Sequence, residues 1–142
     1  MEKGMPLTAV MARTSRLYRI RLNQKLSDHN IDLSSEMCGT LLELGKKEGR
    51  HQKELATTLF KDKGGITKLL KSLSKRAFIF AKADEIDKRH KKIYLTEKGH
   101  QVLKKAMPLV EEVRAQTLNG LDNVEIIQTR EVLEKVISNL IE

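Results

Sequence analysis

A single change of apolar periodicity limits the folds that this chain can adopt. Apolar residues recur at helical spacing up to Arg76, and a strand-like run then begins at Phe78. A second short apolar run covers residues 93–95, and the stretch between the two runs, 84–92, is polar apart from Ile86. Helical spacing returns after Thr96. This order predicts a mainly α fold in which one β-hairpin with a charged loop interrupts a series of helices.

Capping residues separate the predicted helices from one another. Four residues have a side-chain oxygen that can accept a hydrogen bond from a backbone N–H in the first turn of a helix. They are Ser34, Asp62, Thr96 and Asp122. The predicted helices cover residues 7–29, 34–49, 51–60, 63–76, 96–121 and 122–140. The third and fourth are short and closely connected, and the fourth is amphipathic and basic, which is typical of a helix-turn-helix.

The length of 142 residues is that of one domain, and no Pro/Gly/Ser-rich linker divides the chain. A hydrophobic content of 39% with 32% charged residues predicts a folded protein rather than a disordered one. No apolar run approaches the ~18 residues that cross a bilayer, and the first residues lack the pattern of a signal peptide. We therefore expect a cytoplasmic protein with no membrane partner.

Cysteine and histidine usage argues against disulfide scaffolds, metal sites and enzymes. Cys38 is the only cysteine, and it is expected to pack between helices. The four histidines lack the paired spacings of zinc ligands, so no metal and no cofactor is expected. The sequence also shows no Ser/His/Asp or Cys/His constellation, no phosphate-binding glycine loop and no pair of converging carboxylates. We expect that the protein is not an enzyme.

Positive charge is concentrated in the middle of the chain. The net charge is +8, yet residues 46–99 alone hold 16 basic and 7 acidic side chains, while both ends are close to neutral. Such a basic centre favours a polyanion-binding module between two segments that have another role. A solvated lysine-rich surface would give the same count, so the placement of the lysines decides between the two.

The predicted helix over residues 63–76 separates apolar and basic side chains. Its apolar face holds Ile66, Leu69, Leu70 and Leu73, and its opposite face holds Gly64, Lys68, Lys71 and Lys75. Thr67 and Ser72 border the basic face and can bond to phosphates or base edges, and Gly64 with Gly65 lets the helix start approach a groove closely. An ordinary surface helix would show the same stripe, but the second position in a helix-turn-helix favours the major groove of DNA.

The predicted hairpin carries the second basic cluster, Asp87-Lys88-Arg89-His90-Lys91-Lys92. A guanidinium such as that of Arg89 can enter the electronegative minor groove, and Asp87 can orient it through a charge-assisted bond. A lone basic turn is most often a solvated one. A basic helix followed directly by a basic hairpin is instead the layout of a winged helix.

Motifs in the middle of the chain match one known family. They are Leu55-Ala56, Asp62-Lys63, Thr67-Lys68 with Leu73, Asp87-Lys88-Arg89, and Ile93-Tyr94-Leu95-Thr96-Glu97-Lys98-Gly99. The most specific pattern is D-x-R followed by L-T-x-x-G. Together these residues resemble the MarR family of bacterial transcription regulators. The resemblance runs from Leu33 to Gly99 by motif, and over the whole chain by length and by the helices at both ends.

The resemblance implies a homodimer with a single MarR-like domain over residues 1–142. A winged helix-turn-helix core over residues 33–99 would lie between dimerisation helices over residues 1–30 and 100–142. The basic helix would enter the major groove, Arg89 would enter the minor groove, and Asp87 would orient the wing. The residues that we expect to contact DNA are Lys63, Gly64, Thr67, Lys68, Lys71, Ser72, Lys88, Arg89, His90 and Lys91.

The expected function is that of a homodimeric, sequence-specific transcription regulator that binds an inverted repeat in double-stranded DNA. The resemblance further implies a repressor that a small aromatic or lipophilic anion releases from DNA, acting between the dimer helices and the winged helix. The alternative is a non-specific nucleic-acid-binding or architectural winged-helix protein that uses the same basic surface. A protein-interaction bundle would leave the alignment of lysines unexplained.

Three residues depart from the family pattern. Ala77 stands where a glycine usually ends the basic helix, and Ala81 stands where an arginine is common in the first wing strand. Glu85 occupies a place where proline is frequent, and it adds negative charge beside the expected DNA contacts.

Overall fold

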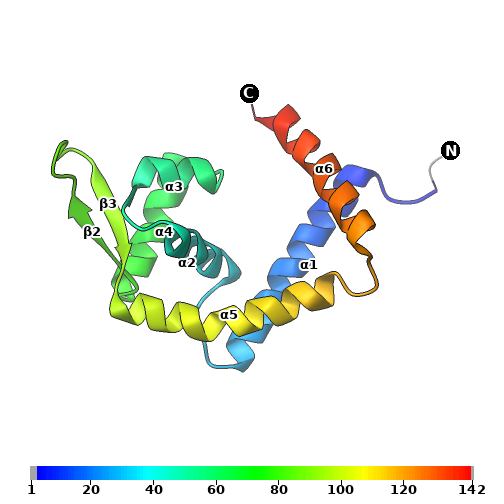
Figure 1. Cartoon of the computed structure of the whole chain (residues 1–142), viewed down its shortest axis with the longest axis horizontal. Helices are drawn as coiled ribbons and strands as arrows, with labels where there is room; N and C mark the ends of the chain where they lie inside the picture. The colour runs from blue at the N-terminus through cyan, green and yellow to red at the C-terminus, as the bar shows by residue number, and fades with distance from the viewer. Residues whose placement is uncertain (1–2, 142) are drawn as a thin grey trace.

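The computed structural model describes residues 3–141, which form six helices and a small three-stranded sheet (Figure 1). In chain order the elements are α1 (Leu7–Asp28), α2 (Ser35–Lys46), β1 (Arg50–His51), α3 (Gln52–Thr58), α4 (Lys63–Lys75), β2 (Ile79–Ala83), β3 (Lys91–Leu95), α5 (Glu97–Thr117) and α6 (Asn123–Leu140). The predicted fold class, mainly α with a β-hairpin wing and a helix-turn-helix core, is confirmed.

The sheet is antiparallel throughout and has the strand order β1-β3-β2. β2 and β3 form the predicted hairpin, in which Ile79 lies opposite Leu95. The third strand, β1, was not predicted, because two residues are too few to show a period of two. His51 was expected at the start of a helix and instead ends β1, opposite Lys92 of β3. The hairpin is thereby attached to the residue that precedes α3.

All four predicted helix caps are present. Ser34, Asp62, Thr96 and Asp122 each accept a hydrogen bond from the backbone N–H three residues further on, over 2.6–3.1 Å. Each of these bonds satisfies one of the N–H groups that the first turn of a helix leaves without an internal partner. The starts of α2, α4, α5 and α6 are therefore set by local chemistry that the sequence shows.

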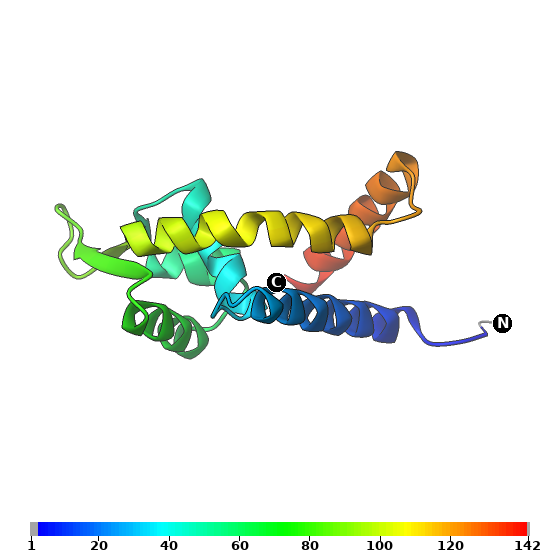
Figure 2. The same ribbon diagram turned by 90° about the horizontal axis from the view of Figure 1, so that it is seen from below.

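The core lies where α2, α4, the sheet and the middle of α5 meet the second half of α1. Its largest fully buried apolar side chains are Leu26, Leu41, Leu44, Leu55, Ile66, Leu73, Val110 and Val113. α5 runs from the sheet to the far end of the molecule and packs along α1 (Figure 2). This long helix connects the wing end of the molecule to the end that holds α6.

The terminal helices leave apolar residues in solvent. None of the residues that the structure describes in α6 is buried, and the first half of α1 is exposed as well. Both segments lie at the end of the molecule opposite the hairpin (Figure 1). In residues 3–141, no helix combines the length and the apolar character that crossing a membrane requires.

Candidate nucleic-acid interface

α4 turns its apolar face into the core and its basic face outward. Ile66, Leu69, Leu70 and Leu73 are buried, as predicted from the helical period. The side opposite to them is exposed, including Lys68 and Lys71. Lys63, Gly64 and Thr67 are also exposed, and Ser72 is half-buried. The residues predicted on the basic face of α4 thus lie together on the surface.

The two glycines at the start of α4 have different surroundings. A Cβ at Gly65 would lie 2.9 Å from Oδ1 of Asp62, the oxygen that caps the helix, so a side chain there would require the capping carboxylate to shift. A Cβ at Gly64 would meet its nearest neighbour only at 3.8 Å. Gly65 therefore lies close to the capping carboxylate, whereas the surroundings of Gly64 are open.

Thr67 uses its hydroxyl inside the protein. Its Oγ1 donates to the carbonyl oxygen of Lys63 (2.7 Å) and accepts from Nε2 of Gln52 (2.8 Å). The hydroxyl proton is thus already engaged, so Thr67 offers DNA an acceptor lone pair rather than a donor. Because Gln52 belongs to α3, this bond also fixes the first helix of the helix-turn-helix against the second.

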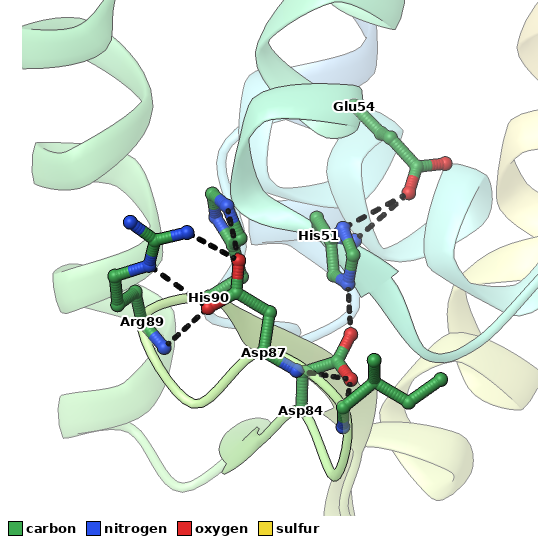
Figure 3. Close-up of polar contacts among 7 residues, drawn as sticks. His51, Glu54, Asp84, Asp87, Arg89 and His90 are labelled. Atoms are coloured by element: carbon green, nitrogen blue, oxygen red, sulfur yellow. Dashed lines mark hydrogen bonds and ion pairs between the residues drawn. The ribbon is translucent and has the colours of Figure 1, made fainter.

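In the wing, Asp87 holds Arg89 through two parallel hydrogen bonds (Figure 3). Nε of Arg89 donates to Oδ1 at 3.0 Å and Nη2 donates to Oδ2 at 3.1 Å, while the Arg89 backbone N–H also donates to Oδ1. These bonds lower the pKa of Asp87 and raise the pKa of Arg89. The guanidinium side chain stays 87% exposed, so a permanently charged group is presented to solvent in a defined pose.

Asp84, at the start of the wing loop, is a buried carboxylate that sequence reasoning missed. Its Oδ1 accepts the backbone N–H groups of Ile86 (2.8 Å) and Asp87 (3.3 Å), and its Oδ2 lies 2.7 Å from Nε2 of His51. The residue is only 8% exposed. Three hydrogen bonds lower the pKa of Asp84 to about 2. The bond from the Ile86 N–H contributes most, followed by the bond from His51 and the bond from the Asp87 N–H.

His51 is the second residue that the sequence did not reveal. It is the last residue of β1 and the N-cap of α3, and its backbone N–H donates to the Glu54 carboxylate at 3.3 Å. Its ring stacks on that of His90 with 5.5 Å between centroids. His90, which was predicted to contact DNA, has its ring against that of His51 and its Nε2 3.5 Å from Oδ2 of Asp87, and its side chain is 53% exposed. Residues separated by 33 positions carry no spacing signal, so only the fold brings His51 and Asp84 together.

α3, the start of α4 and the wing enclose a cleft of about 710 Å³. Basic side chains from all three elements line it: Lys53, Lys61, Lys63, Arg89 and Lys91. Lys61 is paired with Glu36 at 2.6 Å, so its charge is compensated. Lys88 is exposed on the wing loop. The cleft shows that the wing arginine and the first turn of α4 belong to one surface.

The five lysines that were predicted to contact DNA keep their charge uncompensated. They form no ion pair within residues 3–141, and they are Lys63, Lys68, Lys71, Lys88 and Lys91. Two arginines of the same basic segment, by contrast, form ion pairs inside the protein. Arg50 is buried against Glu43 and donates to carbonyl oxygens at the end of α2, and Arg76 pairs with Asp32 at 2.5 Å. We call the five lysines together with Arg89 the basic surface.

Cys38 lies inside the core and away from the basic surface. The thiol is fully buried in α2, and burial raises its pKa to about 11, an effect that the charge of Arg114 reduces only in part. A thiolate is the reactive form of cysteine, so a thiol in this environment is inert at neutral pH. The geometry agrees with a packing role for Cys38.

Comparison with known proteins places this fold. No family model matches the chain. The transcriptional repressor MprA of Escherichia coli K12 is 26% identical over 118 residues, which are 83% of this chain and 67% of the repressor. The Staphylococcus aureus MepR–DNA complex superimposes with a TM-score of 0.87 at 23% identity, covering 96% of this chain and 99% of MepR. A mutant of E. coli MarR, complexed with operator DNA, gives 0.85 at 22% identity, covering 93% of this chain and 94% of MarR. The resemblance to the MarR family is confirmed, and the fold is the one these solved structures share.

Proposed function

Starting from the MarR-type winged-helix fold of this chain, we propose that it is a DNA-binding transcription regulator. The observation that carries the proposal is the basic surface, whose five lysines are uncompensated and whose Lys63, Arg89 and Lys91 line one cleft. Uncompensated cations release counterions when they meet phosphates, which favours binding to DNA. The relatives named above include a repressor and two regulators solved with DNA, which supports the same role.

In the proposed complex, α4 lies in the major groove and the wing in the minor groove. Lys63, Lys68 and Lys71 contact phosphates or base edges, with Gly64, Thr67 and Ser72 beside them on α4. Lys88 and Lys91 contact the backbone beside the wing, and the Arg89 guanidinium enters the minor groove, where the negative potential is strongest. Asp87 sets the orientation of Arg89. His90 supports the wing in this proposal, because its ring packs on His51.

The proposed active form is a homodimer. Residues 33–99 form the DNA-binding part, and residues 1–30 and 100–142 supply the helices that join two copies. Two copies related by a two-fold axis read an inverted repeat whose half-sites lie about one helical turn apart. A regulator of a bacterial chromosome acts in the cytoplasm, which is the proposed location.

Selection of binding sequences from a random duplex library at physiological salt tests sequence specificity. An enriched inverted repeat supports a sequence-specific dimer and defines its site. Retention of DNA without any enriched sequence supports the alternative, a non-specific or architectural winged-helix protein. The matched control is the Lys68→Ala, Arg89→Ala double variant, which should lose enrichment if the basic surface reads DNA. Enrichment that is unchanged in this variant would contradict the assignment of α4 and the wing.

The proposal includes repression that a small aromatic or lipophilic anion relieves. Benzoate and decanoate serve as probes, because they combine a carboxylate with an aromatic ring or an alkyl chain. Each is titrated against the preformed complex with the selected duplex, with sodium acetate as the control for ionic strength. Release by a probe at concentrations where acetate has no effect supports an inducible repressor. No release by either probe removes this ligand class from the proposal.

A further inference from the structure

We propose that His51 is a positioning residue that fixes the pose of Arg89 through Asp84. This inference rests on the proposed function, since it assigns His51 a role in DNA binding. The imidazole of His51 and the guanidinium of Arg89 are connected by three successive polar contacts, all visible in Figure 3. Each contact lies within the described wing or at its junction with α3.

The first contact joins the wing to α3. Because the low pKa of Asp84 makes its carboxylate an acceptor, Nε2 of His51 carries the proton and donates to Oδ2 over 2.7 Å. The other oxygen of Asp84 accepts the backbone N–H groups of Ile86 and Asp87, which shapes the loop. Asp87 in turn holds both the side chain and the backbone N–H of Arg89.

His51 also contacts the other end of the same loop. Its ring stacks on that of His90 at an interplanar angle of 22°. The loop ends are joined to each other, because the Asp84 N–H donates to the His90 carbonyl oxygen at 3.0 Å. His51 therefore contacts both the first and the last residue of the loop that presents Arg89.

The position of His51 is itself well fixed. It lies directly before α3, whose Leu55 is fully buried in the core, and it pairs with Lys92 in the sheet. The wing loop, by contrast, has no apolar anchor of its own, because Ile86 is 97% exposed. Polar contacts must then determine the loop conformation, and the His51–Asp84 bond is the contact that ties it to a helix. Without His51, Oδ2 of the buried Asp84 loses its partner, which is costly.

Two substitutions at the same position separate this role from the capping of α3. Asn is a favoured residue at a helix N-cap but is too short to reach Asp84, so His51→Asn retains the helix start and removes the bond. Gln places an amide nitrogen close to the position of Nε2, so His51→Gln restores a donor to Asp84. Far-UV circular dichroism checks that both full-length variants keep their helices.

The readout is affinity for the selected duplex, or for random duplex if none is enriched. We expect His51→Asn to weaken binding about 10-fold and His51→Gln to stay within about 3-fold of wild type, as for partial loss of an arginine contact. In an Arg89→Ala background, His51→Asn should cause no further loss, because His51 acts through Arg89. Hydrogen exchange should show faster exchange of the Ile86 and Asp87 amides in His51→Asn.

The possible failures are distinguishable. A wild-type protein that binds no duplex refutes the proposed function. A wild-type protein that binds, with His51→Asn equal to it, refutes the inference alone. An equal loss in the wild-type and Arg89→Ala backgrounds also overturns it, since His51 would then act independently of the arginine. If His51→Asn does not fold, Asp84→Ala interrupts the same connection from the wing side, and it should likewise have no effect in the Arg89→Ala background.

Discussion

Arg89 is the side chain from which we expect the largest single contribution to DNA affinity. Its guanidinium is exposed and oriented, and replacing it with Ala should cost about 1–3 kcal/mol of binding free energy. Lys68→Ala should cost a comparable or smaller amount and reduce the salt slope by about one if the ammonium group contacts a phosphate. Fluorescence anisotropy over a series of salt concentrations measures both effects.

Lys104→Ala is the control for this measurement, because Lys104 is exposed on α5 outside the basic surface. It should leave affinity and salt slope unchanged apart from a small long-range effect of net charge. Wild-type affinity in both Arg89→Ala and Lys68→Ala would show that DNA binds elsewhere on the molecule.

Asp84 should make the folded state sensitive to acid. Its pKa in the folded protein is about 2, below its ordinary value of 3.8, so folding favours the ionised form. The resulting stabilisation is complete above the pKa of the unfolded chain and is lost as the pH falls from about 4 to about 2. The free energy of unfolding in urea, measured between about pH 5 and pH 2, should decrease less for Asp84→Asn than for wild type.

Other carboxylates, including Asp32 and Asp87, also have lowered pKa values. Because they are present in both proteins, the difference between wild type and Asp84→Asn reports Asp84 together with its smaller effect on Asp87, whose pKa the Asp84 charge raises. A difference that stays constant with pH would mean that Asp84 is not ionised preferentially in the folded state.

At the residue scale, the sequence predicted a contact between residues close together in the chain and missed contacts between residues far apart. The Asp87–Arg89 pair was predicted because two residues apart in a tight loop can bond to each other. The His51–Asp84 contact joins residues 33 positions apart, and no periodicity or motif connects them. The contact between Gln52 of α3 and the Thr67 oxygen was missed for the same reason, and sequence reasoning had left that hydroxyl, whose proton goes to the Lys63 carbonyl, free for DNA.

At the element scale, the end of α4 departs from the usual chemistry of a helix stop. The Phe78 N–H bonds to the Leu73 carbonyl and the Ala77 N–H to the Ser74 carbonyl, a pattern in which the residue after the cap is left-handed. Here that residue is Ala77, with φ 61° and an exposed methyl group. An L-residue in this region carries a steric penalty that glycine avoids.

We therefore expect Ala77→Gly to stabilise the protein. Relief of the left-handed strain outweighs the greater entropy of glycine in the unfolded chain, for a net gain of about 0.5–1 kcal/mol. Ala81→Gly is the matched control, because Ala81 is exposed in β2. Loss of its Cβ should destabilise the folded protein by about 0.5–1 kcal/mol. Urea denaturation of both variants measures the change in the free energy of unfolding. If Ala77→Gly destabilises the protein, Ala77 is not strained at the end of α4.

Helix starts were predictable because a cap and its partner lie three residues apart. Other features of the elements needed the fold. β1 is two residues long and exists only because β3 lies beside it. Gly99 matched the motif after the wing, but its reason became visible only in three dimensions, where a Cβ would overlap the carbonyl oxygen of Phe78. The sequence thus predicts helices from local signals and leaves short strands and close approaches to tertiary structure.

At the scale of the whole molecule, the apolar residues of α6 require a partner. Its exposed apolar residues are Val124, Ile127, Val132, Leu133, Ile137 and Leu140, and none of its described residues is buried. α1 adds the exposed Leu7, Val10, Leu17 and Ile20, and its first half lies at the same end of the molecule as α6 (Figure 1). Most of the stability of a helix in a protein comes from packing its apolar face, and α6 buries none of its described residues. A second copy of the chain would supply a surface for that face, which is the basis for the proposed homodimer.

A double substitution within α6 tests this arrangement. Leu133→Glu with Ile137→Glu places two charges on the apolar stripe, and burying them in an interface would be unfavourable. By sedimentation velocity at micromolar concentration, we expect this variant to be a monomer and the wild type to be a dimer. Affinity for the inverted repeat should fall about 100-fold or more, because each half-site is then bound independently. Gln128→Glu with Ser138→Glu adds the same charge at exposed polar positions of α6 and should leave both the dimer and DNA affinity intact. A wild-type monomer, or a double variant that remains dimeric, would show that the terminal helices do not join two copies.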